Sequence, residues 1–297
     1  MTGELVQQLT SVSVSRLVDM LAGAFQREGI AEPTSEAREI VAALYDAPRF
    51  WPIANGELLV DRETFDRARQ AMARRIQGAP LAYAVGRAAF RNLTLDVDER
   101  VLIPRPETEQ IVDLVLDETR GEHGGVAVDV GVGSGAIAIA LASEGTFSRV
   151  YGTDISLDAL AVARHNVELC AAVRRAPVDL VHGSLLAPLL DVRARVVVSN
   201  PPYIALGEAE TLPAAVRDWE PAVALFSGAD GMTATARLVR QAAEVLSPGG
   251  LIALEVDARR ASLVAELVSR ERRFHRIRVE LDLFGRERFV LARRQAT

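Results

Sequence analysis

The chain has 297 residues, of which 49% are hydrophobic and 25% charged, and its formal net charge is −6; this composition is typical of a soluble globular enzyme with room for two domains. The acidic balance argues against direct nucleic-acid binding, and the lack of a long apolar run in the sequence argues against a membrane segment. The single cysteine, Cys170, excludes an intramolecular disulfide and is typical of a reducing compartment, so we expect a cytoplasmic protein.

Residues 1–79 are predicted to form a small helical domain. Three segments carry apolar residues at helical spacing, and the second of them follows Thr34-Ser35, a pair typical of a helix N-terminus. The predicted helices run over Val14–Phe25, Glu36–Tyr45 and Arg62–Ile76.

Residues 80–103 change to short alternating segments. The segment Leu93–Val97 alternates apolar and polar residues, which favours a strand and predicts a hairpin-like connector. Pro104 and Pro106 then break the pattern. A helix is expected over Glu107–Leu116, with Pro106 near its first position.

Strand and helix patterns alternate from Val126 onward, within a predicted domain over residues 104–297. Such alternation implies a mostly parallel sheet that helices cover on both faces. The last two strands have no helical pattern between them, which predicts an antiparallel hairpin. The strands are expected at Val126–Val130, Arg149–Gly152, Val178–His182, Arg195–Ser199, Leu251–Val256, Phe274–Glu280 and Arg288–Ala292, and the helices at Ala136–Ser143, Leu157–Leu169, Thr233–Leu246 and Ala261–Arg270.

A glycine-rich loop, Asp129-Val130-Gly131-Val132-Gly133-Ser134-Gly135, joins the first of these strands to its helix. Its glycines allow a tight turn and a close approach of a ligand to the backbone, and the helix N-terminus offers free N–H groups. Asp154 ends the next strand, 19 positions after Gly135 (154 − 135). A carboxylate there can accept hydrogen bonds from both hydroxyls of a ribose, so the loop and Asp154 predict a cofactor that contains a nucleoside.

The loop leaves two classes of cofactor open. Gly131-x-Gly133-x-x-Ala136 also matches the looser dinucleotide pattern, which would make the chain a nicotinamide-dependent oxidoreductase. Asp129 favours S-adenosyl-L-methionine, because a carboxylate can approach the amino acid part of that cofactor and would repel a pyrophosphate. The antiparallel end of the sheet favours a methyltransferase as well. A cap of the loop is the alternative interpretation of Asp129.

Four residues, Asn200-Pro201-Pro202-Tyr203, follow directly on the fourth strand. The Asn200 side chain and the Pro201 backbone each offer a carbonyl oxygen, so together they can accept both hydrogens of a planar –NH2 group. The prolines restrict the backbone, and Tyr203 can provide a flat wall for such a group. The tetrapeptide alone could also be a simple turn. Ligands of parallel sheets, however, bind at the carboxyl ends of the strands, where the glycine loop and Asp154 also fall.

The chain resembles the release factor glutamine methyltransferases, also called the PrmC or HemK family, over nearly its whole length. The glycine loop is common to many methyltransferases, and the Asn-Pro-Pro-Tyr motif is shared with enzymes that methylate exocyclic amines of bases. The run from Pro104 to Glu109, together with the helical N-terminal domain, singles out this family. The family-like motifs are Gly78-x-Pro80-x-x-Tyr83-x-x-Gly86, Leu102–Glu109, Asp129–Gly135, Asn200–Ile204, Glu220-Pro221-x-x-Ala224-Leu225, Gly228-x-Asp230-Gly231, Ser247–Gly250 and Asp282-Leu283-x-Gly285-Arg286.

The resemblance implies a class I methyltransferase fold, which is a Rossmann-like α/β domain whose seven-stranded sheet has an antiparallel C-terminal hairpin, joined to a small all-α N-terminal domain. It implies S-adenosyl-L-methionine as the methyl donor. The implied target is the side-chain nitrogen (N5) of the glutamine in the Gly-Gly-Gln loop of class-one peptide chain release factors. The N-terminal domain would help to dock the release factor, and a monomer is expected.

The same resemblance implies the site residues. Asn200, Pro201, Pro202 and Tyr203 would bind the target amide and carry the reaction. Two positions depart from the family: Ser184 stands where an acidic residue usually reaches the adenine amino group, and Asp257 lies in a turn that usually contains glycine. The cofactor would contact Asp129, Val130, Gly131, Val132, Gly133, Gly135, Asp154, Ser184, Leu185 and Asn200.

Two further functions stay open. The same motif would serve the methylation of an adenine amino group in DNA or RNA, against which the acidic chain and the lack of a basic channel count. A non-catalytic protein-binding module could keep the fold, against which the intact Asp129, Asp154 and Asn200 count. A strong base is not expected, because an N-methylated amide cation loses its proton readily. The histidines show no catalytic or metal-ligating spacing; they are His123, His165, His182 and His275.

Overall fold

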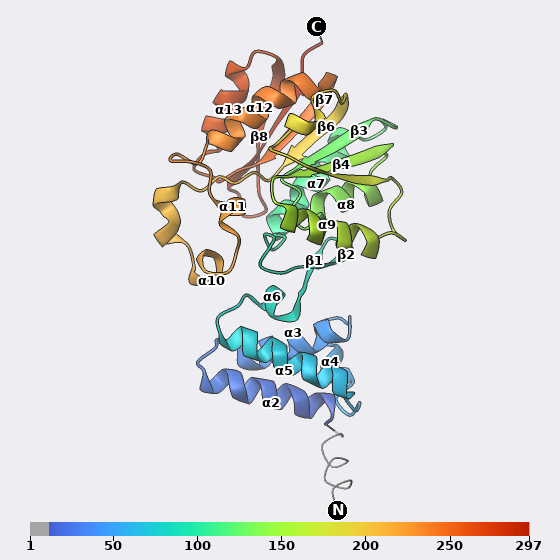
Figure 1. Cartoon of the computed structure of the whole chain (residues 1–297), viewed down its shortest axis with the longest axis vertical. Helices are drawn as coiled ribbons and strands as arrows, with labels where there is room; N and C mark the ends of the chain where they lie inside the picture. Colours follow the sequence, from blue (N-terminus) through green and yellow to red (C-terminus); the bar gives the residue numbers. More distant parts are fainter. Residues whose placement is uncertain (1–11, 297) are drawn as a thin grey trace, which may run out of the picture. The chain divides into compact units, whose positions relative to one another are not determined.

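The structure, a computed structural model, describes residues 12–296 of the chain (Figure 1). The contacts within it divide the chain into two compact units. The first comprises Met1–Arg87 together with Ala214–Trp219, and the second comprises Ala88–Pro213 together with Glu220–Thr297. Each unit has a hydrophobic core of its own.

The first unit is helical, and capping side chains fix where two of its helices begin. The hydroxyl of Ser13 accepts a hydrogen bond from the N–H of Arg16, and Asp61 accepts one from the N–H of Thr64 at 2.8 Å. The three long helices confirm the helical patterns of the sequence, whereas α4 and α6 are too short to show a helical period. The elements are α2 (Val14–Arg27), α3 (Pro33–Leu44), α4 (Trp51–Ala54), α5 (Arg62–Ile76) and α6 (Leu81–Val85).

After α6 in the chain, β1 (Arg87–Phe90) and β2 (Leu93–Asp96) form a two-stranded sheet, and β2 lies in the segment Leu93–Val97 whose alternation predicts a strand. Arg91, between the two strands, has a positive φ of 54°. The helix α7 (Pro106–Glu118) then begins with its proline in the first turn, where a missing N–H costs no hydrogen bond.

The second unit contains a seven-stranded sheet with the order β5-β4-β3-β6-β7-β9-β8. The first five of these strands are parallel, and β9 is antiparallel to both β7 and β8, so the predicted C-terminal hairpin is confirmed. The strands are β3 (Val126–Val130), β4 (Arg149–Asp154), β5 (Val178–His182), β6 (Ala194–Ser199), β7 (Leu246–Glu255), β8 (Phe274–Leu281) and β9 (Glu287–Arg294).

The strand β7 begins five residues before the predicted start at Leu251 (251 − 246). Leu246 pairs with Ala194 of β6, and a register shift then separates that pair from Val196 and Leu251. The proline and glycines between these two pairs conceal the strand in the sequence, because such residues are typical of turns.

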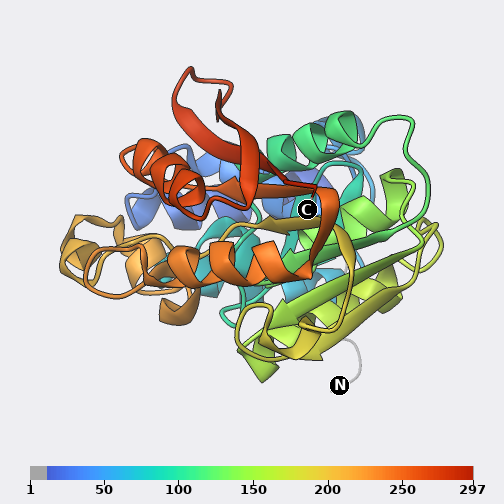
Figure 2. The ribbon, with the colours of Figure 1, turned by 90° about the horizontal axis from the view of Figure 1, so that it is seen from above.

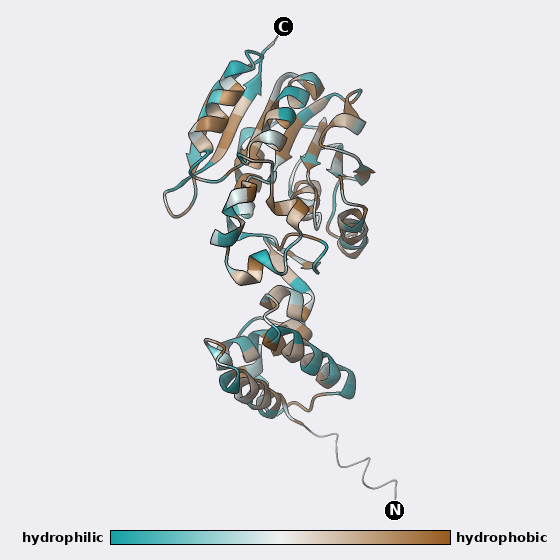
Figure 3. Ribbon diagram, turned by 60° about the vertical axis from the view of Figure 1, so that its left-hand side comes forward, coloured by the Kyte–Doolittle hydropathy of each residue, from teal (hydrophilic) through white to brown (hydrophobic). Residues whose placement is uncertain are grey.

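Helices cover both faces of this sheet, as the strand–helix alternation predicts (Figures 1 and 2). Successive strand residues point to opposite faces. In β6, Val196 and Val198 belong to the core under α7, α8 and α9, whereas Val197 belongs to the core under α12 and α13. Figure 3 shows hydrophobic residues concentrated along the strands. The remaining helices are α8 (Ala136–Glu144), α9 (Leu157–Leu169), α10 (Ala214–Arg217), α11 (Ala222–Leu225), α12 (Thr233–Val245) and α13 (Ala261–Arg270), with short 3₁₀ segments at Ala187–Leu189 and Leu206–Thr211.

Gly152 of β4 lies directly against the loop that follows β3. A Cβ atom at Gly152 would meet Val132 Cγ2 at 2.6 Å and Leu180 Cδ2 at 2.9 Å. Since interiors are close-packed, we expect Gly152→Ala to lower the free energy of unfolding by about 1–3 kcal/mol, measured by urea denaturation. A matched change, Gly207→Ala, meets no heavy atom within 4 Å and is expected to leave the midpoint unchanged. Equal midpoints for the two variants would contradict the prediction.

Candidate functional site

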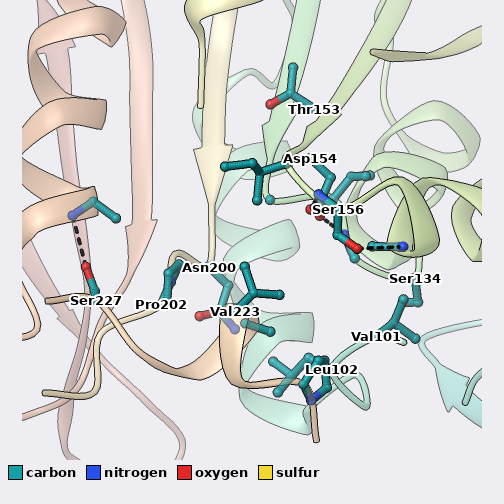
Figure 4. Close-up of a pocket in the computed structure, with 18 of the residues that line it drawn as sticks. Val101, Leu102, Ser134, Thr153, Asp154, Ser156, Asn200, Pro202, Val223 and Ser227 are labelled. Atoms are coloured by element: carbon teal, nitrogen blue, oxygen red, sulfur yellow. Dashed lines mark hydrogen bonds between the residues drawn. The ribbon is translucent and has the colours of Figure 1, made fainter. Parts of the chain in front are cut away.

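A cavity of about 380 Å³ opens at the carboxyl ends of the strands, and its lining residues come from distant parts of the second unit (Figure 4). In the sheet, β4 lies on one side of β3 and β6 on the other, so the chain reverses its direction of travel across the sheet at this point. Ligands of open α/β sheets bind at such a switch point. The lining includes the loop before α7, the loop after β3, the end of β4, the loop after β5, the loop after β6, and residues 221–228.

The glycine loop forms one wall of the cavity. Gly131, Gly133 and Gly135 have positive φ values of 76°, 51° and 88°, a region that residues with a Cβ rarely adopt. At Gly135 a Cβ would also meet the side chain of Ile139 at 3.1 Å. Gly131 to Ser134 line the cavity, whereas the predicted contacts Val130 and Gly135 are not among its lining residues.

Asp154 lines the cavity and also holds the glycine loop. One carboxylate oxygen accepts a hydrogen bond from the Gly133 N–H at 3.0 Å, and the other accepts one from the Ser156 N–H at 2.9 Å. Each carboxylate oxygen can accept more than one hydrogen bond, so both keep capacity for a ligand. The group predicted to bind a ribose therefore fixes the loop beside it as well.

Asp129 is only 1% exposed and is not among the residues that line the cavity. Its Oδ2 accepts a hydrogen bond from the Ala138 N–H at 3.0 Å, in the first turn of α8. Burial raises the pKa of this carboxyl well above its ordinary value, and its Oδ1 has no hydrogen-bond partner among residues 12–296. The contacts thus support the cap interpretation of Asp129, in which it joins α8 to the end of β3.

The four residues after β6 differ in how they meet the cavity. Asn200 and Pro202 line it, whereas Pro201 and Tyr203 are not among the lining residues. The Asn200 Nδ2 donates to the Thr108 hydroxyl at 3.3 Å. Burial, followed by the charge of Glu255, raises the pKa of Tyr203 to about 12, so its hydroxyl keeps its proton at neutral pH.

Apolar side chains and the loop after β5 complete the cavity. The predicted contacts Ser184 and Leu185 both line it, and Leu185 has a positive φ of 54°. Val101, Leu102 and Ile137 add apolar surface. The cavity fits a nucleoside-containing cofactor. Its apolar side chains suit the base, the open glycine backbone suits the tail, and the carboxylate at the strand end suits the ribose.

An ion pair that the sequence analysis missed joins two stretches of the lining. Arg105, before α7, pairs with Glu220 at 2.5 Å, and the Glu220 side chain is 1% exposed. Burial raises the pKa of Glu220, against the charge of Arg105. The two residues lie in motifs that are family-like, but they are 115 positions apart, and no local pattern reveals their pairing.

Between residues 12 and 296, no group of three His, Cys, Asp or Glu side chains could hold a metal ion. None of the helices in that range has both the length and the apolar character that crossing a membrane requires.

Sequence comparisons relate the chain to known proteins. The profile of the "Methyltransferase small domain" matches residues 108–217, and the "PrmC N-terminal domain" matches residues 17–86. A release factor glutamine methyltransferase of Rhodopirellula baltica is 34% identical over 95% of this chain and 96% of its own length. That of Streptomyces coelicolor is 39% identical over 90% of this chain and 92% of its own length.

Two solved structures share the fold at low sequence identity. The catalytic domain of hMettl16, in complex with an RNA hairpin, has a TM-score of 0.54 and 14% identity, and the match covers 80% of this chain and 84% of that one. A methyltransferase from Pyrococcus furiosus has a TM-score of 0.51 and 18% identity, with 70% and 92% covered. These matches support the predicted class I methyltransferase fold of the second unit.

Proposed function

Because the chain belongs to the release factor glutamine methyltransferase family, we propose that it methylates the side-chain amide nitrogen of the glutamine in the Gly-Gly-Gln motif of class-one peptide chain release factors. The observation that carries the proposal is the place of Asn200. It lines the same cavity as the glycine loop and Asp154, so an amide acceptor lies beside the site that fits a methyl donor.

The lining residues fit S-adenosyl-L-methionine. Asp154 would accept hydrogen bonds from the ribose hydroxyls, Gly131 and Gly133 would allow the ligand to approach the backbone, and Ser184 with Leu185 would contact the adenine. When bound, this cofactor would supply an activated methyl group on its sulfonium sulfur, which would be left as a thioether, and the methylated amide cation would then lose one proton to water.

Asn200 and Pro201 orient the target amide. The Asn200 side-chain carbonyl and the Pro201 backbone carbonyl accept the two amide hydrogens, which fixes the direction of the nitrogen. The same two dipoles stabilise the positive charge that grows on the nitrogen as it reacts. None of the four histidines, all within the described range, lines the cavity.

The helical first unit is proposed to help bind the release factor. This role rests on the family resemblance and on the match of residues 17–86 to the N-terminal domain of the same family. A release factor presents its Gly-Gly-Gln motif on a loop, and a loop needs a second contact to be held for reaction.

Mass spectrometry tests the proposed function. Purified release factor is incubated with the protein and S-adenosyl-L-methionine, and a gain of one methyl group on the Gly-Gly-Gln peptide is expected. A release factor whose motif glutamine is replaced by alanine is the matched control and should gain none. A methyl gain only on added DNA or RNA would show that the chain is a nucleic-acid methyltransferase. Cofactor binding without any transfer would favour a non-catalytic module.

A further inference from the structure

A line of polar side chains leads from the half-buried Asn200 into the core of the second unit. The Asn200 Nδ2 donates to the Thr108 hydroxyl at 3.3 Å. The same hydroxyl acts on the Glu255 carboxyl, whose pKa it lowers against the effect of burial, and Glu255 Oε2 has no hydrogen-bond partner within residues 12–296. Thr108 is 6% exposed and Glu255 is 2% exposed. Ser199 and Leu254 are paired across β6 and β7, so Asn200 and Glu255 follow a matched pair at the same edge of the sheet.

The direction in which the Thr108 hydroxyl donates its proton decides which side of the Asn200 amide faces the cavity. A hydroxyl has only one proton to donate. If Thr108 gives that proton to an ionised Glu255, its oxygen can only accept from Asn200. The amide must then turn its NH2 toward Thr108 and leave its carbonyl oxygen free for the cavity. An amide turned the other way would offer a target –NH2 group two donors and no acceptor.

We propose that Thr108 and Glu255 are positioning residues, which set the Asn200 side-chain carbonyl toward the target amide. The expected effect on the rate rests on the proposed function. The arrangement of Asn200, Thr108 and Glu255 does not depend on that function. Neither residue was a candidate in the sequence, because Thr108 reads as part of a helix start and Glu255 as the end of a strand.

The charge state of Glu255 adds a dependence on pH. Burial raises the pKa of Glu255 to about 7; the Thr108 hydroxyl, Arg288 and Arg105 act against burial, and Glu107 acts with it. Tyr203 also faces this carboxyl and stays neutral. Above pH 7 the ionised carboxylate can only accept a hydrogen bond. The Thr108 proton is then directed at Glu255, and the Asn200 carbonyl oxygen faces the cavity. Below pH 7 the protonated carboxyl can itself donate to Thr108, so the amide can turn around.

The first experiment monitors the Asn200 side chain and does not depend on the methyl transfer reaction. In NMR spectra, the side-chain NH2 signal of Asn200, identified by its loss in Asn200→Ala, is expected to shift with a midpoint near pH 7. The shift should disappear in Glu255→Gln, whose amide does not titrate. A signal that ignores pH in the unmodified protein, or one that still titrates in Glu255→Gln, would overturn the proposal whether or not the protein methylates release factors.

The second experiment follows the rate of methyl transfer to a release factor between pH 5.5 and 8.5. We expect kcat to rise about ten-fold with pH, through a midpoint near 7. Thr108→Val, which keeps the shape but not the hydroxyl, should lower kcat at pH 8 about ten-fold and remove the midpoint, with cofactor affinity by calorimetry unchanged. Thr108→Ser should restore both the rate and the midpoint. A purely structural role for Thr108 would lower cofactor affinity or stability and leave the midpoint in place, and that result would contradict the inference.

Discussion

Replacing Asn200 with alanine is expected to lower the rate of methyl transfer by about 100- to 1,000-fold, because it removes a preorganised acceptor directed at the charge that grows on the reacting nitrogen. The change should weaken cofactor binding much less, since the glycine loop and Asp154 remain in place. Single-turnover rates with a release factor and calorimetric titration of S-adenosyl-L-methionine measure the two effects separately.

One control variant makes the Asn200 result specific. Asn92→Ala changes an exposed asparagine in the turn between β1 and β2, and it should leave the rate unchanged. Near-normal turnover of Asn200→Ala would mean that Asn200 does not hold the target amide. A large loss of cofactor affinity in the same variant would instead assign Asn200 to the cofactor.

Replacing Asp154 with alanine is expected to raise the dissociation constant of S-adenosyl-L-methionine by about 100-fold. The carboxylate offers charged acceptors to the ribose hydroxyls and also accepts the Gly133 N–H at 3.0 Å, so its loss removes ligand contacts and frees the glycine loop. Calorimetry measures the constant.

Two other aspartate variants serve as controls for Asp154→Ala. Asp154→Asn keeps one acceptor oxygen without the charge and should give an intermediate constant. Asp158→Ala, in the first turn of α9, removes an exposed carboxylate four residues along the chain and should change the affinity little. If Asp158→Ala weakened binding as much as Asp154→Ala, a general loss of negative charge would explain both.

Much of the fold was predictable because the spacing of apolar residues along the sequence indicates which side chains of a helix or strand are buried. The alternation of strands and helices after Val126, and the missing helix between the last two strands, correctly predicted the parallel sheet and its antiparallel end. The start of β7 was not predictable, because its pairing with β6 depends on a register shift in a proline- and glycine-containing stretch. The short helices α4 and α6 lack a full helical period to display.

Some residues of the candidate site could likewise be predicted from the sequence, and others could not. Asp154 and Asn200 could be found because they stand at strand ends, where a parallel sheet brings distant residues together. The partners of these groups could not be found, since a hydrogen bond such as that from Asn200 to Thr108 joins residues 92 positions apart. Tyr203 shows a related limit: the motif identifies the residue, but whether it lines the cavity depends on packing that no local pattern displays, and it is not among the lining residues.

The burial of Glu255 couples folding to proton uptake. Its pKa rises on folding from an ordinary 4.5 to about 7, so between these values the folded protein binds more protons than the unfolded chain, and this group lowers stability as pH rises through that window. Asp282 and Glu208, whose pKa values backbone N–H donors lower, act in the opposite sense at acid pH. Glu255 therefore favours the folded state on the acid side of pH 7, as do the buried Asp129 and Glu220 carboxyls, whose pKa values burial also raises. The proposed reaction gains from the alkaline side, so Glu255 draws the optimum of stability and the optimum of the rate apart.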